Sequence, residues 1–270
     1  MVIQYFMTLL LIYLAVGAFA GLLAGLFGIG GGLVIVPVLV ITFEALGFPV
    51  EVLTHMAVGT SLATIAFTSL SSVRTHHQKG AVDWPLATRI SMGILLGAVL
   101  GVLTANALSG AGLQLVIGIS ALIVAAQMGL GLKPKPTRSL PSKRGLVVAG
   151  SGIGWGSALF GIGGGSITVP FLTWCNYPMQ RSVAVAAACG FPIALVGGLS
   201  NIVVGWDNSA LPENTLGYVY WPALIGIVIT SVPCARLGAK LAHKLSPEKL
   251  KKLFAVMLVV VAAKFLSASL

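Results

Sequence analysis

Charged residues are scarce in this chain. Only 8% of its 270 residues are charged and six are acidic, while 57% are hydrophobic and the mean hydropathy is +1.01. These values lie outside the range of soluble domains, so the sequence predicts an all-α polytopic membrane protein. The net charge of +10 does not indicate a nucleic-acid partner, because the basic residues lie in short loops between apolar spans, where they set orientation.

Cysteine is also rare, and acidic residues are missing from the apolar spans. Cys175, Cys189 and Cys234 are odd in number and lie in or beside apolar spans, so neither a disulfide framework nor a metal site is indicated. The lack of acids deep within any span argues against a carboxylate proton relay and favours an anionic cargo. No nucleotide-binding loop is present, and we expect no cofactor.

A glycine-rich stretch, FGIGGG, occupies residues 27–32 and again residues 160–165, and each copy is followed by a proline, Pro37 or Pro170. Consecutive glycines break a helix, since each costs about 1 kcal/mol relative to alanine. At membrane depth the freed N–H and C=O groups are tolerated only where they face a cavity or other protein. Close packing through a GxxxG spacing would explain one copy. Two matching copies instead indicate the paired broken helices of a transporter binding site.

Apolar segments alternate with short loops along the whole chain. Segments long enough for a bilayer fall at about 5–26, 54–73, 83–108, 112–132, 182–205, 217–242 and 248–268. The first of them reads as a retained span, not a signal peptide. Shorter apolar pieces at about 30–46, 145–160 and 166–177 flank the glycine breaks. The linker 133–144, rich in proline and basic residues, separates a first membrane repeat (1–132) from a second (145–270) within one integral membrane domain.

The two repeats match beyond the glycine stretches. At an offset of 137 residues, Trp84-Pro85 pairs with Trp221-Pro222 and Gly101 pairs with Gly238, which indicates an internal duplication. The distribution of basic residues places loops 74–82 and 133–144 in the cytoplasm and both termini in the periplasm. Each repeat then combines one re-entrant, glycine-broken helical hairpin with three transmembrane helices. Because three crossings reverse the chain, the repeats are predicted to be inverted, an architecture used for alternating access.

The helices that restart after the glycines are the predicted binding site. Their first N–H groups are unpaired and lie at the positive end of a helix dipole, so two such ends can bind an anion without a buried lysine. Ser166 and Thr168 add hydroxyls in the second copy. Pro37 and Pro170 each remove an N–H and should keep these helices short or bent. The predicted substrate-binding residues are Gly30, Gly31, Gly32, Leu33, Gly163, Gly164, Gly165, Ser166, Thr60, Ser61 and Asn201.

Three of those residues lie on neighbouring spans, and each has a structural alternative. Thr60 and Ser61 could bond back to their own helix, and Asn201 could equally serve packing. The segment Cys189–Pro192 predicts a second helix interruption in the span that carries Asn201. These residues therefore extend the predicted site only if their side chains reach the glycine breaks.

Basic residues and histidines at the ends of the spans offer further roles. Arg74, His76 and His77 form a predicted basic mouth on the cytoplasmic side, which attracts substrate, enforces topology or binds lipid phosphates. His55, at the outer edge of its span, has a side chain that titrates near physiological pH. It is either a carrier of a coupling proton or an interfacial polar residue.

The twinned FGIGGG stretches with their prolines, the turn Gly80-Ala81-Val82-Asp83-Trp84 and the segment 237–242 together resemble the TauE/SafE family of membrane permeases over nearly the whole chain. This resemblance implies a cargo among sulfite, organosulfonates and related sulfur-containing anions, moved across the bacterial inner membrane. It gives functional weight to both glycine triplets, Gly30–Gly32 and Gly163–Gly165, and to the adjoining prolines. In place of the family's basic, aromatic-rich cytoplasmic turn, this chain has residues 75–78, THHQ.

The sequence as a whole favours a secondary transporter, and not an enzyme, that moves a small sulfur-containing anion such as sulfite, thiosulfate or an organosulfonate. Proton coupling is the simplest expectation, because no ATP-binding motif is present. A passive anion channel is the first alternative. A membrane enzyme or accessory subunit of sulfur metabolism is the second, and would need a nucleophile with its base or a set of metal ligands. Which anion is moved, in which direction, and whether the chain forms a homodimer stay open.

Overall fold

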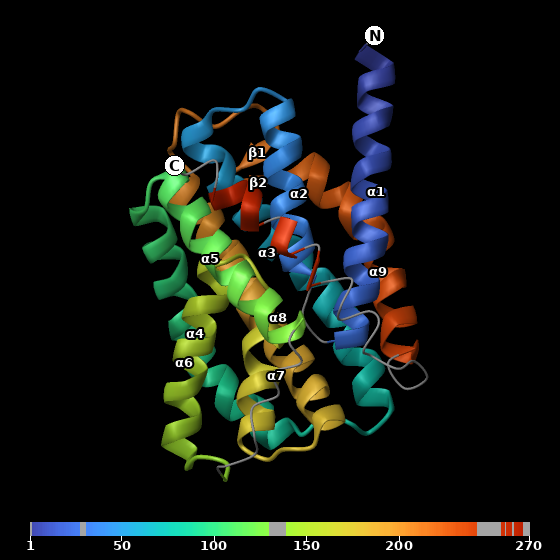
Figure 1. Ribbon diagram of the computed structural model, residues 1–270, viewed down its shortest axis with the longest axis vertical. Coiled ribbons are helices and arrows are strands. Elements are labelled where there is room, and N and C mark those ends of the chain that lie inside the picture. Colours follow the sequence, from blue (N-terminus) through green and yellow to red (C-terminus); the bar gives the residue numbers. More distant parts are fainter. Residues whose placement is uncertain are drawn as a thin grey trace.

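The computed structural model describes residues 2–27, 31–129, 139–241, 255–256, 258–260 and 262–266. Almost all of this described part is helical (Figure 1). The elements in chain order are α1 (Val2–Phe27), α2 (Gly32–Ala45), α3 (Val50–Gln78), α4 (Trp84–Ala107), α5 (Gly110–Gly129), α6 (Lys143–Leu159), α7 (Gly165–Trp174), α8 (Met179–Gly205), β1 (Thr215–Leu216), β2 (Val219–Tyr220) and α9 (Trp221–Leu241).

The prediction of an all-α polytopic membrane protein is confirmed. Within the described residues, six helices are long and apolar enough to cross a membrane. Their apolar stretches are Met7–Leu26, Val50–Gln78, Trp84–Ala107, Gly110–Gln127, Met179–Gly205 and Trp221–Leu241. Helix α2 is a shorter apolar helix, and α7 is shorter still. Most of the predicted span 248–268 lies outside the described residues.

Two local expectations were wrong. Helix α8 runs without a break from Met179 to Gly205, although Cys189–Pro192 predicted an interruption. A proline removes one helical hydrogen bond and tends to bend the helix, but packing on both sides can hold the helix together. The span predicted to begin at residue 217 begins at Trp221, because residues 215–220 form a small antiparallel hairpin with Gly217 at φ 53°.

The first helix of each repeat packs against a helix of the other repeat. Helix α1 lies along α9 in parallel, as Gly17 meets the backbone of Ile227 and Gly21 meets that of Ser231. Helix α6 lies along α4 in the same way, as Gly150 meets the backbone of Ile90 and Gly154 meets that of Ile94. The glycines of α1 and α6 in these contacts are 133 residues apart, and their partners on α4 and α9 are 137 residues apart. These are the same two offsets that relate the repeats in sequence.

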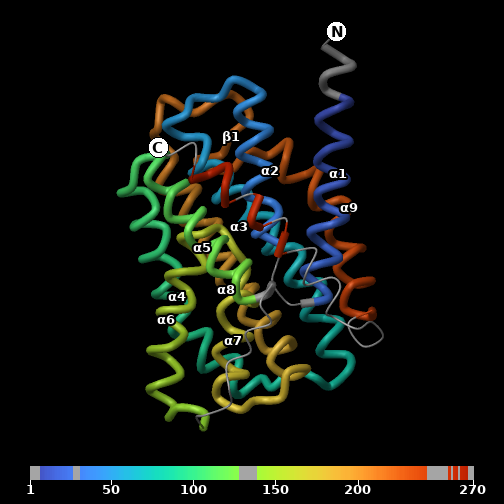
Figure 2. Tube along the Cα trace, in the orientation of Figure 1, coloured from blue at the N-terminus to red at the C-terminus, as the bar shows by residue number. Residues whose placement is uncertain are grey.

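The two short helices that follow the glycine stretches lie in opposite halves of the molecule. Helix α1 begins at the upper end of the view and α2 turns back toward that end, whereas α6 begins at the lower end and α7 turns back toward it (Figures 1 and 2). The N-terminal ends of α2 and α7 therefore lie in the interior, and their C-terminal ends lie toward opposite surfaces.

Side-chain contacts fix the turns that follow the two short helices, α7 and α2, at opposite ends of the molecule. At one end, Tyr177 in the α7–α8 turn donates a hydrogen bond of 2.8 Å to Asp83, which also caps α4 by accepting from the N–H of Leu86. At the other end, the rings of Phe48 and Tyr220 pack edge to face with centroids 5.3 Å apart. The turn after α7 is therefore fixed by a hydrogen bond to a carboxylate, and the turn after α2 is fixed by aromatic packing.

The Tyr177 contact predicts an alkaline change in stability. Burial, followed by the hydrogen bond and charge of Asp83, raises the pKa of Tyr177 above its usual value. Because the folded state then holds this proton more tightly than the unfolded state, the contact stabilises the fold fully below about pH 10, the usual tyrosine value, and this stability is lost as the pH rises further. We expect Tyr177→Phe to cost about 1 kcal/mol at pH 8.

Thermal unfolding of the detergent-solubilised protein between pH 8 and pH 11 measures this effect. The melting temperature of the wild type should fall toward that of Tyr177→Phe as the pH increases. Parallel pH profiles for the two proteins would show that the contact does not contribute in this way.

Candidate functional site

The two glycine stretches touch in the interior. A Cβ atom added at Gly32 would overlap the carbonyl oxygen of Gly161 and lie 2.7 Å from the Cα atom of Ile162. Ser61, which is fully buried on α3, donates a hydrogen bond of 2.8 Å to the same carbonyl oxygen of Gly161. The start of α2, the α6–α7 connection and the middle of α3 therefore meet at one point, as the paired glycine motifs predicted.

Glycine is required at two of these positions by backbone conformation. Gly31, which caps the N-terminus of α2, has φ 77°, and Gly161 has φ 66°. Both values lie in the left-handed region, which side chains with a Cβ atom rarely adopt. This conformation turns the chain sharply between the two helices of each hairpin.

The helix starts leave several backbone donors unpaired. In α2 the first hydrogen bonds to Gly31 are donated by Val34 and Ile35, and in α7 the first to Gly164 are donated by Ile167 and Thr168. Neither helix has a side-chain cap. No described residue accepts from the N–H groups of the following residues: Gly32, Leu33, Gly163, Gly164, Gly165 and Ser166.

These unpaired donors are buried, which is unusual. All six residues except the partly buried Ser166 are buried. Buried N–H groups almost always find an acceptor, and the N-terminal end of a helix carries partial positive charge. The arrangement can therefore bind an anion through backbone N–H groups alone.

Hydroxyl groups are present at only one of the two helix starts. Thr168, on the second turn of α7, is fully buried, and the hydroxyls of Thr168 and Ser166 have no partner among the described residues. The equivalent part of α2 carries the buried aliphatic residues Leu33 and Val34. The α7 start is therefore the more polar side of the site.

The site contains no fixed charge. No aspartate, glutamate, lysine or arginine is among the buried residues that the structure describes. In that same part of the chain, no group of three or more His, Cys, Asp or Glu side chains could hold a metal ion. Neutral dipoles and hydroxyls are thus the groups that this interior offers to a ligand.

Two other predicted site residues, Thr60 and Asn201, lie beside the β1–β2 hairpin and not at the glycine stretches. The Thr60 hydroxyl accepts a hydrogen bond of 2.9 Å from the N–H of Tyr220. Asn201 donates through its side-chain amide to the carbonyl of Gly197, and its own carbonyl accepts from the N–H of Tyr218. Tyr218 and Tyr220 belong to the 215–220 hairpin, which the sequence did not predict, whereas Gly197 lies one turn before Asn201 on α8. The side chain of Asn201 therefore bonds back to its own helix, and the role of Thr60 depends on a contact that the sequence did not show.

The remaining predicted residues are distributed as follows. Pro37 and Pro170 lie inside α2 and α7, which stay short, and Gly30 lies outside the described residues. Arg74 is exposed whereas His76, two residues later on α3, is buried, so they do not line one cluster. His77 accepts a hydrogen bond of 3.1 Å from the indole of Trp84.

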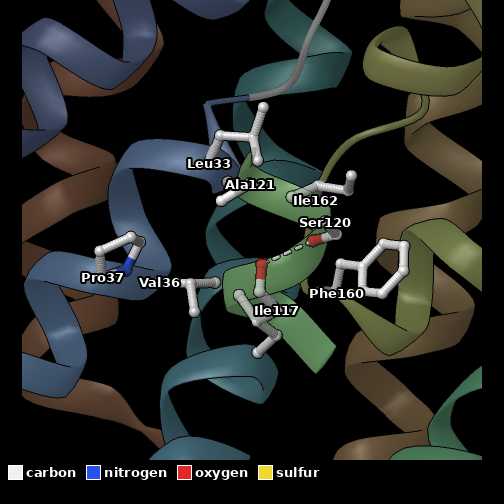
Figure 3. Close-up of a pocket in the computed structure, with 9 residues that line it drawn as sticks. Leu33, Val36, Pro37, Ile117, Ser120, Ala121, Phe160 and Ile162 are labelled. Atoms are coloured by element: carbon white, nitrogen blue, oxygen red, sulfur yellow. Dashed lines mark hydrogen bonds between the residues drawn. The ribbon is translucent and has the colours of Figure 1, made fainter. Parts of the chain in front are cut away.

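A small hollow lies beside the contact between the two stretches (Figure 3). Gly32 and Ile162 contribute to its wall together with residues of α2 and α5. Ser120 supplies the only side-chain hydroxyl of this lining, and that hydroxyl donates to the carbonyl of Ile117 on its own helix at 2.7 Å. The side chains of the hollow are thus apolar or already bonded, and they offer no free donor to an anion.

Gly190 and Ser69 lie near the start of α7 although the sequence does not place them in the predicted site. Both are buried, and a Cβ atom on Gly190 would lie 3.7 Å from the Cβ atom of Ser69 and 3.9 Å from the nitrogen of Gly164. The Ser69 hydroxyl donates to the carbonyl of Ala66 on its own helix at 3.1 Å. In the sequence, Gly190 stands out only as a glycine within an apolar span, and this pattern does not show which helices approach it.

Comparison with known proteins identifies the family. A family model described as "Sulfite exporter TauE/SafE" matches residues 13–265. The chain belongs to this family. A probable membrane transporter protein of Haemophilus influenzae is 40% identical over 257 residues, which cover 94% of this chain and 97% of the relative. A probable membrane transporter protein of Methanocaldococcus jannaschii is 31% identical, with 91% of each chain covered. No solved structure matches the chain.

Family membership confirms the resemblance seen in the sequence. The family description and the names of the relatives indicate a membrane transporter, and the six candidate spans fit that class. The TauE/SafE family also implies an anion as the transported substrate.

Proposed function

We propose that this protein is a secondary transporter for a small sulfur-containing anion, of the sulfite, thiosulfate or organosulfonate class, in the bacterial inner membrane. The observation that carries the proposal is the pair of helix starts that meet in the interior with buried, unpaired N–H groups. No buried cation accompanies them among the described residues. Such a site attracts an anion but binds it less tightly than a lysine or arginine would, which suits release on the far side.

Alternating access between inverted repeats is the mechanism that we propose. The opposite directions of α2 and α7, and the contacts of α1 with α9 and α6 with α4 that repeat at matching offsets, support an inverted relation between the halves. In this mechanism the glycine contact stays near the middle while the surrounding helices tilt, which exposes the anion first to one side and then to the other. We further propose that the termini are periplasmic.

A passive channel is the main alternative, and a transport assay must distinguish it from a transporter. A transporter occludes its substrate and saturates, and it exchanges labelled for unlabelled substrate across the membrane. A channel with a continuous pore does not show such counterflow. An enzyme of sulfur metabolism would return a chemically altered product.

The experiment is uptake of radiolabelled sulfite, thiosulfate, sulfate and a short alkyl sulfonate into proteoliposomes, with and without an imposed pH gradient. We expect saturable uptake of at least one of these anions, counterflow when unlabelled anion is preloaded, and chemically unchanged substrate inside. A faster rate when the pH gradient is imposed would support proton coupling. Uptake of none of these anions under either condition would overturn the proposal.

A further inference from the structure

Thr168 differs from the other buried threonines on neighbouring helices. Thr64, Thr68 and Thr75 of α3 each donate their hydroxyl to a carbonyl of their own helix. Thr173, one and a half turns after Thr168 on α7, donates to the carbonyls of Val169 and Pro170 at 2.9 and 3.0 Å. The hydroxyl of Thr168 is fully buried and has no partner among the described residues. A buried hydroxyl without a partner is destabilising, so its retention needs another explanation.

The Thr168 hydroxyl lies beside the start of its own helix. Its oxygen is 3.4 Å from the position that a Cβ atom on Gly164 would take. Gly164 also approaches α8, since that Cβ atom would lie 2.7 Å from the end of the Ile193 side chain. Ser166 has a second unpaired hydroxyl, but two residues correspond to about 200° around a helix, so it points to a different side.

Gly190 of α8 leaves space at this point. A Cβ atom added there would have only two neighbours within 4 Å, the Cβ atom of Ser69 at 3.7 Å and the backbone nitrogen of Gly164 at 3.9 Å. Glycines that serve helix packing in this protein are different, because a Cβ atom at Gly150 or Gly154 would overlap the backbone of α4. Gly190 is thus buried, yet its packing does not require glycine.

We propose that the Thr168 hydroxyl, together with the N–H groups of Gly164 and Gly165, binds an oxygen of the anion in the space that Gly190 leaves open. This inference rests on the proposed function and assigns the side-chain contact to the α7 start. The α2 start, where Leu33 and Val34 are buried and aliphatic, offers backbone N–H groups but no hydroxyl. Thr168 is then a residue that sets affinity for oxyanions.

The test compares uptake kinetics of Thr168→Val with those of wild type, using whichever of the four anions the wild type transports. Valine keeps the shape of threonine and removes the hydroxyl. Because a hydrogen bond to a charged group is lost, we expect KM to rise about tenfold or more. Thr168→Ser should stay within about threefold of wild type. Thr173→Val is the matched control, since its hydroxyl already bonds within α7, and KM should not change.

Gly190→Ala provides an independent arm. Its methyl group has room, and alanine is a better helix former than glycine, so the melting temperature should equal or exceed that of wild type. KM should nevertheless rise severalfold, because the methyl group takes the space of an anion oxygen. The stabilisation of the purified protein by added anion should shrink in both Thr168→Val and Gly190→Ala.

The outcomes separate the two proposals. If the wild type transports an anion and both variants keep its KM, recognition through Thr168 is wrong while the transporter assignment stands. If the wild type transports none of the anions, the proposed function itself fails. A rise of KM in Thr173→Val equal to that in Thr168→Val would also overturn the assignment, because it would indicate a general disturbance of α7.

Discussion

Replacing Gly32 with alanine should abolish saturable anion uptake and lower the thermal stability of the purified protein. The new methyl group would overlap the carbonyl oxygen of Gly161 and crowd the Cα atom of Ile162. Both neighbours are backbone atoms, so no rotation of a side chain relieves the clash. Overpacking of this kind costs about 1–3 kcal/mol. Relief requires the two helix starts to separate, which would remove the site in which we place the anion.

Uptake assays and thermal unfolding in detergent measure the two effects separately. Gly152→Ala on α6 is the matched control, because a Cβ atom there has no neighbour within 4 Å. It should transport like the wild type and be equally or more stable, since alanine favours a helix by about 1 kcal/mol over glycine. Wild-type kinetics in Gly32→Ala would mean that the contact between the glycine stretches is not needed for transport.

Cysteine labelling should give an all-or-none result for the orientation. Ala45 is exposed at the end of α2, next to Glu44, whose carboxylate forms an ion pair of 2.8 Å with Lys264. Ser139 is exposed in the segment before α6, and α6 begins at the end of the molecule opposite to the one toward which α2 turns (Figure 1). Because basic loops stay in the cytoplasm, Ala45→Cys should react with an impermeant thiol reagent added to intact cells. Ser139→Cys should react only after the membrane is permeabilised.

The native cysteines need attention in this experiment. Cys175 and Cys189 are buried, but Cys234 is partly exposed and should be replaced by serine in the parent protein. Ala210→Cys, in the loop before the β-hairpin, is a second outer position and should label like Ala45→Cys. If Ala45→Cys and Ser139→Cys label from the same side, the inverted arrangement of the repeats is wrong.

The glycine stretches and the helix order could be predicted from the sequence. Six of the seven predicted long apolar segments correspond to candidate membrane helices among the described residues. The repeated glycines indicated that the residues around Gly32 and Gly161 approach each other. The contact between these two residues agrees with that interpretation. Both features depend on short segments whose local composition is decisive.

Contacts between distant side chains could not be predicted in the same way. Thr60 and Asn201 are polar residues at membrane depth, but the Thr60 hydroxyl and the backbone carbonyl of Asn201 accept hydrogen bonds from the 215–220 hairpin, which only the fold brings near. The side-chain amide of Asn201 donates to Gly197 of its own helix. The segment Cys189–Pro192 suggested an interruption, yet α8 continues through Pro192, as α2 continues through Pro37 and α7 through Pro170, because tertiary packing outweighs local preference. The space at Gly190 arises from the approach of three helices and has no local signature.

The pairing of α1 with α9 has a consequence for biosynthesis. The face of α1 that carries Gly17 and Gly21 is completed only by residues near Ile227 and Ser231, which the ribosome adds some two hundred residues later. Helix α6, in contrast, finds α4 already made when it emerges. The first helix must therefore wait in the bilayer with its glycine face covered by lipid or by another protein, and a nascent chain that stops before α9 leaves that face without its native cover.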